Sequence, residues 1–163
     1  HNEGGMIVNE TIDHIGKNFG VLVFAAAGND YGRNIDKKRA FPASFKSDYL
    51  LVVASTSKRG RLSFFSNIGP KSVDVAAPGS DVFSTMPGNG YGNMSGTSMA
   101  TPTTVGVAAE VLSHFPELGP LQLKKAIMEG VTPVKSFKGK MVTGGRIDLV
   151  NSLQFTLNNY NTL

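Results

Sequence analysis

Three short apolar runs constrain the fold of this chain more than any other feature. They occupy residues 21–26, 50–54 and 73–77, and only the third contains a charged residue, Asp74. Apolar runs without polar alternation are typical of strands buried on both faces of a parallel sheet. The first run directly follows residues 8–19, where apolar residues recur every three or four positions and predict an amphipathic helix closed by glycine.

Further helices and a hairpin are expected downstream. Residues 100–115 are small or apolar and predict a long, closely packed helix, and residues 120–129 predict another, since proline opens it and glycine follows it. A short helix is expected after residue 148, followed by a frayed tail from residue 158. Residues 82–94 predict a hairpin that turns at Pro-Gly-Asn-Gly. In the first helix, the residues expected to face the core are Val8, Ile12, Ile15 and Phe19.

Alternating helices and buried strands predict an α/β sandwich with a parallel sheet. The chain has 163 residues, of which 40% are hydrophobic and 17% charged, so it can build a core. Three or four strands are few for an independent sheet of this kind. We therefore expect the whole of residues 1–163 to be one part of a larger domain, with no internal boundary.

Composition excludes several classes of function. The chain has no cysteine, which removes disulfides, thiol nucleophiles and thiolate metal sites. No apolar run approaches the roughly 20 residues that span a bilayer, so no membrane span is expected. Only residues 37–39 form a tight basic run, and no aromatic residues interleave with basic clusters, so no nucleic-acid partner is expected. No calcium-loop pattern occurs, and we expect neither a metal site nor a cofactor in this chain.

Asn29 is the first candidate for chemistry. It follows the first apolar run on a glycine turn, within Ala25-Ala26-Ala27-Gly28-Asn29-Asp30. Ligands bind at the carboxyl ends of strands in open parallel sheets, and an amide N–H can stabilise a developing oxyanion. The same pattern is also typical of an ordinary turn asparagine, so this segment alone leaves both interpretations open.

Ser98 is the second candidate. It lies in Gly96-Thr97-Ser98-Met99-Ala100-Thr101-Pro102, at the start of the long apolar helix. A serine there is often only a helix cap. The free N–H groups and the dipole of a helix N-terminus also favour negative charge, so a hydroxyl at this position can attack a carbonyl while its own N–H holds the oxyanion. Gly96 would let a substrate backbone approach closely.

Several segments resemble those of the subtilisin-like serine proteases. Residues 96–102 resemble the nucleophile signature of the family, and residues 26–29 resemble its oxyanion-hole segment. Asn29 and Ser98 are 69 positions apart, as the layout of the family requires. Other similar segments follow in the expected order, so the resemblance covers residues 10–153; they are Phe65-Ser66-Asn67-Ile68-Gly69, residues 73–79, residues 84–92 and Gly145-Arg146-Ile147-Asp148.

The resemblance implies a role for each site residue. Ser98 would be the nucleophile, and its N–H and the Asn29 side chain would form the oxyanion hole. The fold implied is the C-terminal portion of a three-layer α/β/α domain with a mainly parallel sheet. The resemblance also implies a polypeptide substrate, secretion, and calcium in the full-length parent. The residues implied to bind substrate are Ala26, Ala27, Gly28, Gly96 and Thr97.

One departure and one gap qualify the resemblance. After Pro102 the family usually continues His-Val-Ala-Gly, whereas this chain has residues 103–106 as Thr-Thr-Val-Gly, a change expected to alter packing. The catalytic aspartate and histidine segments of the family are absent, and neither His1, His14 nor His114 is placed to act as the base. We expect both residues upstream, outside this sequence, and an isolated chain that is inactive. It would need the missing N-terminal half or would self-associate through an open strand edge.

Three alternatives stand beside the leading interpretation of an endopeptidase part. A catalytically dead subtilase-like binding or scaffold module would need neither Ser98 nor Asn29, and the upstream residues would decide. An α/β-hydrolase esterase would share a nucleophile elbow but needs an aspartate and a histidine after the serine, and His114 is poorly placed. A nucleotide loop at residues 88–92 lacks the following Lys-Ser/Thr.

Overall fold

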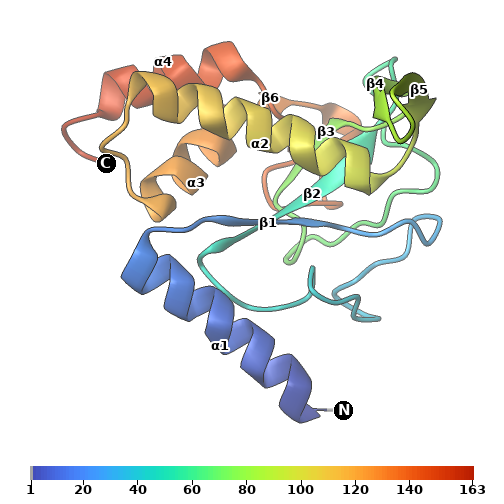
Figure 1. Cartoon of the computed structure of the whole chain (residues 1–163), viewed down its shortest axis with the longest axis horizontal. Coiled ribbons are helices and arrows are strands. Elements are labelled where there is room, and N and C mark those ends of the chain that lie inside the picture. The colour runs from blue at the N-terminus through green and yellow to red at the C-terminus, as the bar shows by residue number, and fades with distance from the viewer. Residues whose placement is uncertain (1) are drawn as a thin grey trace.

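The computed structural model describes the backbone of residues 2–163 and the side chains within residues 5–163. The described chain forms three layers. Helix α1 (Asn2–Phe19) lies on one side of a sheet, as Figure 1 shows. Helices α2 (Thr97–His114), α3 (Pro120–Glu129) and α4 (Leu149–Asn159) cover the other side. The predicted layered α/β fold with a mainly parallel sheet is confirmed.

The central sheet has five strands in the order β1-β2-β3-β7-β6. Strands β1 (Val23–Ala26), β2 (Leu50–Thr56), β3 (Val75–Pro78) and β7 (Gly145–Arg146) are parallel neighbours, and β6 (Thr132–Pro133) joins β7 in the antiparallel sense. In the described residues β1 pairs with β2 alone, so it forms one edge of the sheet.

The predicted hairpin is present as a separate two-stranded sheet. Strand β4 (Val82–Met86) pairs antiparallel with β5 (Gly90–Met94). Residues Phe83 and Tyr91 stack with ring centroids 5.9 Å apart, and both are largely exposed. The hairpin therefore projects from the layers rather than burying a face of its own.

The sheet separates two cores, which explains why the apolar runs show no alternation. Along β2, Leu50, Val52 and Ala54 belong to the core beneath α1, whereas Leu51 and Val53 belong to the core beneath α2. Every residue of β2 is buried. Both faces therefore need apolar side chains, as a parallel strand covered by helices requires.

The predicted core face of the first helix is partly wrong. Ile12 is buried, but Val8 is 45% exposed and Phe19 is 71% exposed. Helix α1 packs on the side of Ile12 and Gly16, where the missing side chain of glycine leaves room for the ring of Tyr49. A stripe of spaced apolar residues predicts a helix, but it cannot identify the contact face when Met6 and Ile7 are also apolar and exposed.

Several boundaries differ by a few residues from those expected. The first strand begins at Val23 because Gly20, with φ at +68°, turns the chain between α1 and the sheet. Helix α2 begins at Thr97 rather than at residue 100, and α4 extends to Asn159 into the expected frayed tail. Strands β6 and β7 were not predicted, since each has only two residues. No helix among residues 2–163 is long and apolar enough to cross a membrane.

Asp74 is a buried carboxylate just before β3. Its Oδ2 accepts a hydrogen bond from Val52 N at 2.7 Å, and Lys124 Nζ lies 4.0 Å from it while donating to Leu50 O at 2.6 Å. Burial raises the pKa of Asp74 above its ordinary value, although Lys124 and the Val52 N–H act in the opposite direction. The carboxylate therefore links β2, β3 and α3 but is poorly solvated when charged.

We expect Asp74→Asn to remove a pH dependence of folding stability. A raised folded-state pKa means that the folded protein binds this proton more tightly, so the contribution of Asp74 is present at low pH and is lost as the pH rises through its folded pKa. The asparagine keeps an acceptor for Val52 N but does not ionise. Urea unfolding from about pH 4 to about pH 8 should show the free energy of unfolding of the variant increasing relative to that of the wild type as the pH rises. Exposed Asp48→Asn is the control, and an equal trend there would contradict the expectation.

Candidate functional site

The loop after β1 and the start of α2 meet at the carboxyl ends of the parallel strands. Thr97 joins them: its backbone N donates to Asn29 Oδ1 at 3.0 Å, and its hydroxyl donates to the same oxygen at 3.0 Å. The hydroxyl also accepts a hydrogen bond from Gly28 N at 3.2 Å. Thr97 is fully buried and Asn29 is exposed, so these three bonds form a clasp that is buried on the Thr97 side. The structure thus brings together the two segments that the sequence singled out.

The clasp fixes the direction of the Asn29 amide. With Oδ1 held by Thr97, the Nδ2 group is left to face Gly96. A Cβ placed on Gly96 would lie 3.6 Å from Asn29 Nδ2 and 3.6 Å from Ser98 N. The two nitrogens therefore border the same space beside Gly96, as does Met99 Sδ, which would lie 3.5 Å from that Cβ. In the described part of the chain Ser98 N donates to no acceptor, and the side chains of Asn29 and Ser98 are both exposed.

Helix α2 begins without a side-chain cap. Its N-cap is Gly96, whose N donates to Gly79 O at 2.7 Å, and Ser98 is the second helical residue. Ser98 is therefore not the cap, and the positive end of the helix stays open toward the space beside it. Gly79 allows the chain after β3 to pack closely against the first turn of α2. An added Cβ at position 79 would lie 2.6 Å from Ser55 Oγ, 2.7 Å from Gly96 O and 2.8 Å from Ala100 Cβ.

The predicted substrate-binding residues differ in their exposure to solvent. Ala26 and Gly28 are half-buried beside Asn29, and Gly28 has φ at +98°. Ala27 exposes no surface, and its carbonyl accepts a hydrogen bond from Asn67 Nδ2 at 2.9 Å. Thr97 is likewise buried. Ala27 and Thr97 can therefore hold the site in place but offer no side chain to a ligand.

No histidine among the described residues approaches Ser98. His14 is exposed on α1, on the other side of the sheet. His114 ends α2 about 24 Å along the helix axis from Ser98, at 1.5 Å per residue, and its Nε2 lies 3.4 Å from Glu110 Oε1. His1 lies outside the described residues. In the part of the chain that the structure describes, a hydroxyl and two N–H donors therefore lie near one another, without a histidine beside them.

Metal-ligating side chains do not gather either. Within the described residues, no group of three or more His, Asp or Glu side chains could hold a metal ion. Asp30 beside the site is paired with Arg33, whose Nη2 lies 2.9 Å from Asp30 Oδ1. The calcium expected for the full-length parent stays a prediction.

One structural residue of the site was not singled out from the sequence. Asn67 is fully buried and bonds to the loop that carries Asn29. In the sequence it follows Ser66 and precedes Ile68 and Gly69, and nothing local shows that its amide meets a loop 37 positions earlier. Only its place in a segment resembling the family pointed to it.

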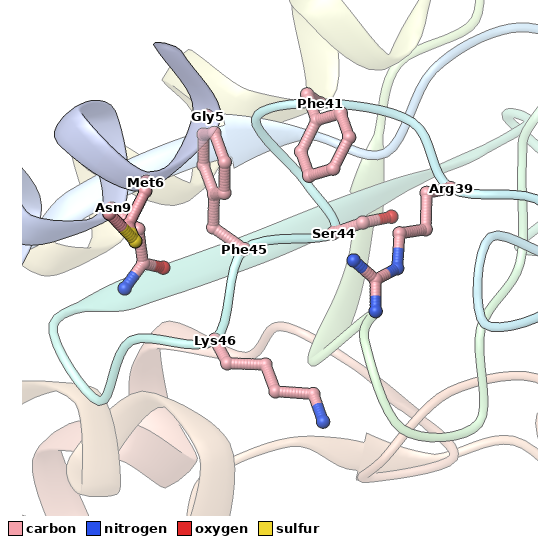
Figure 2. A pocket seen from close by; sticks show the side chains of 8 residues that line it. All are labelled: Gly5, Met6, Asn9, Arg39, Phe41, Ser44, Phe45 and Lys46. Carbon is pink, nitrogen blue, oxygen red and sulfur yellow. The ribbon is translucent and has the colours of Figure 1, made fainter. Parts of the chain in front are cut away.

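A hollow beside α1 is separate from this site. Figure 2 shows it between α1 and the loop before β2, with a volume of about 530 Å³. Neither Ser98 nor Asn29 contributes to it, and two basic side chains and two phenylalanine rings do. Its lining residues are Gly5, Met6, Asn9, Arg39, Phe41, Ser44, Phe45 and Lys46.

Comparison with known sequences gives a consistent family. The sequence model described as "Subtilase family" matches residues 2–145. The halolysin-like extracellular serine protease Nep of Natrialba magadii is 41% identical over 105 residues, which are 64% of this chain and 18% of that protein. Subtilisin DY of Bacillus licheniformis is 38% identical over 113 residues, which are 69% of this chain and 40% of that protein.

Solved structures have the same fold. The A-subunit of the AB5 toxin from E. coli superposes with a TM-score of 0.81 at 26% identity, covering 93% of this chain and 56% of that one. The prenylagaramide maturation protease PagA superposes with a TM-score of 0.78 at 28% identity, covering 91% of this chain and 55% of that one. The chain thus spans little more than half of these structures and less than half of the two curated relatives.

We expect Thr97→Val to lower the free energy of unfolding by about 1–3 kcal/mol, because Gly28 N would lose its acceptor and Asn29 Oδ1 one of its donors in a partly buried clasp. Denaturant unfolding at neutral pH measures the loss. Thr104→Val is the matched control, since Thr104 is equally buried but its hydroxyl only donates to the α2 carbonyl of Ala100 at 3.1 Å. A loss no larger than that of the control would contradict the clasp.

Proposed function

The chain belongs to the subtilase family, and from this premise we propose that it supplies the nucleophile and the oxyanion hole of a serine endopeptidase. Ser98 is the proposed nucleophile, and Asn29 Nδ2 and Ser98 N are the proposed oxyanion donors. The observation that carries the proposal is the space beside Gly96, which both nitrogens border. Curated relatives named as serine proteases support the reaction class.

The proposed reaction follows from this geometry. Ser98 Oγ attacks the carbonyl carbon of a peptide bond, and the new C–O bond turns the carbonyl oxygen into an oxyanion. Ser98 N–H and Asn29 Nδ2 donate to that oxygen, and the N-terminus of α2 adds a favourable potential. The proton of the hydroxyl passes to a base and then to the leaving amine as the C–N bond breaks. Water hydrolyses the acyl-enzyme, which frees Ser98.

We propose that the base and its orienting acid lie upstream, in residues outside this sequence. A serine hydroxyl needs an adjacent base to react at neutral pH, and no histidine of residues 2–163 is near Ser98. The substrate is proposed to be a polypeptide. Its acyl side would lie along Ala26 and Gly28, which are half-buried beside Asn29, and along the backbone of Gly96, which is itself buried.

The open side of the sheet supports a partner for this chain. The unpaired edge of β1 is flanked on the α2 side by an apolar hollow of about 190 Å³, to which Leu22, Phe24, Val105 and Leu112 contribute. On the α1 side, Met6 and Phe19 are exposed. We propose that the N-terminal half of the same domain pairs with β1 and covers these apolar groups, and that self-association is the alternative when that half is missing.

A catalytically dead subtilase-like binding module is the second candidate. It is favoured by the lack of a base among the described residues, whereas the convergent donors beside Gly96 favour the enzyme. Secretion is proposed for the parent protein, since a relative is named an extracellular protease. The upstream sequence separates enzyme from module, because only the enzyme needs the aspartate and the histidine.

We expect a fluorophosphonate probe to label the full-length protein on Ser98. The probe phosphorylates an activated serine and mimics the oxyanion in the site. Ser98→Ala should abolish labelling and peptide hydrolysis, as mass spectrometry of the adduct and a fluorogenic peptide assay would show. Ser95→Ala is the matched control, since Ser95 is exposed three residues away and its hydroxyl only accepts from Asp81 N at 2.8 Å. A folded but unlabelled parent would favour the binding module.

We expect the isolated chain to hydrolyse no peptide at a useful rate and not to persist as a monodisperse monomer. The first result follows from the missing base and the second from the unpaired β1 edge. Light scattering and a peptidase assay on the pure chain test both, and co-expression with the upstream half should restore turnover. Turnover by the chain alone would overturn the proposed place of the base.

A further inference from the structure

Asn67 makes hydrogen bonds to the loop residues that precede Asn29 and to the residue that follows it. Its Nδ2 donates to Ala27 O at 2.9 Å and to Asp30 Oδ2 at 2.8 Å, and its Oδ1 accepts from Asp30 N at 2.9 Å. Its backbone N donates to Gly28 O at 2.9 Å. Asn67 thus contacts the residues before and after Asn29 without bonding to Asn29 itself.

Burial makes these bonds costly to lose. Asn67 is 0% exposed, and both hydrogens of its amide are used. Without it, the carbonyl of Ala27 and the N–H of Asp30 would lose their partner, and Ala27 is fully buried, so its carbonyl has little access to water. The second carboxylate oxygen of Asp30 is held by Arg33 at 2.9 Å, so the charge near Asn67 is balanced.

The backbone packs directly on the Asn67 amide. Gly28 has φ at +98°, a conformation that favours glycine. A Cβ at that position would lie 2.5 Å from Asn67 Nδ2, closer than real atoms approach. The loop conformation that presents Asn29 and the amide that supports it are therefore matched to each other in shape.

We propose that Asn67 is a positioning residue for the oxyanion hole, which sets where the Asn29 side chain lies by fixing the backbone on both sides of it. Thr97 holds the side chain of Asn29 from α2, and Asn67 holds its backbone from the segment before β3. Asn67 touches no substrate. This inference rests on the proposed function, since it assigns Asn67 to the donor that Asn29 would provide.

The test uses the full-length protease with Asn67→Ala, assayed below its unfolding temperature, with active sites counted by fluorophosphonate titration. We expect kcat to fall by about tenfold to a hundredfold, because misplacing a catalytic group by about 1 Å can cost about 100-fold. KM should change by less than about threefold, because a donor used mainly in the transition state affects kcat. Ser66→Ala is the matched control: Ser66 is buried beside Asn67, and its hydroxyl accepts from Ser55 N of β2 and donates to the backbone O of Asn67 at 3.1 Å, but it makes no bond to the Asn29 loop and leaves the Asn67 amide in place.

A double-mutant cycle separates positioning from stability. In an Asn29→Ala background, Asn67→Ala should lower kcat by less than about twofold, because no donor remains to be positioned. An equal loss in both backgrounds, an equal loss in Ser66→Ala, or an unchanged kcat in Asn67→Ala would each overturn the proposal. If Asn67→Ala does not fold, Asn67→Ser replaces it, with a smaller loss expected. Failure of both to fold would assign Asn67 to the fold alone and overturn positioning.

The controls distinguish this inference from the proposed function. Asn29→Ala alone should lower kcat by about 10²–10³, a magnitude that comes from a subtilisin rather than from this structure. If Asn29→Ala does so while Asn67→Ala does not, the inference fails and the function stands. If Ser98 is not labelled in the wild-type parent, the function itself fails.

Discussion

The hydrogen bonds between Thr97 and Asn29 are the interaction on which the rest of the site depends. They connect segments 68 positions apart, one at the end of β1 and the other at the start of α2. A side-chain amide in an exposed loop would otherwise sample several rotamers and lose that freedom only when a ligand arrives. With one end of the amide already bound, the other end is directed at the space beside Gly96 before any substrate is present. Preorganised donors of this kind need no rearrangement at the moment when charge develops.

The sheet is what allows this interaction to form. Parallel strands β1, β2 and β3 end at the same edge, so the loops that follow them are neighbours although the sequence separates them. Two cores, one beneath α1 and one beneath α2, hold the strands from both faces. Gly79 then lets the chain leaving β3 pass directly under the first turn of α2. Rigid layers therefore determine the geometry of the loops that carry the proposed site residues.

The sequence predicted those features that depend on local pattern or on family motifs. The layered fold, the hairpin and the long helices follow from periodicity and turn chemistry, and the proximity of Asn29 and Ser98 follows from strand order and the motifs. The contact face of α1 was not predictable, because Val8 and Phe19 are as apolar as Ile12 yet remain exposed. Asn67 was not predictable either, since its importance depends on a contact with a loop 37 positions away. The roles of Ser98 and Asn29 remain predictions.

The close contact between Gly28 and Asn67 limits which amino-acid substitutions this region can accept. Any side chain at position 28 would collide with the amide at position 67 and would also have to adopt a positive φ. A smaller residue at position 67 would relieve the collision, but it would leave the groups bonded to Asn67 without partners. Each single change is therefore unfavourable before the other has occurred. The collision couples the two positions, so the cost of a side chain at position 28 is expected to depend on which residue occupies position 67.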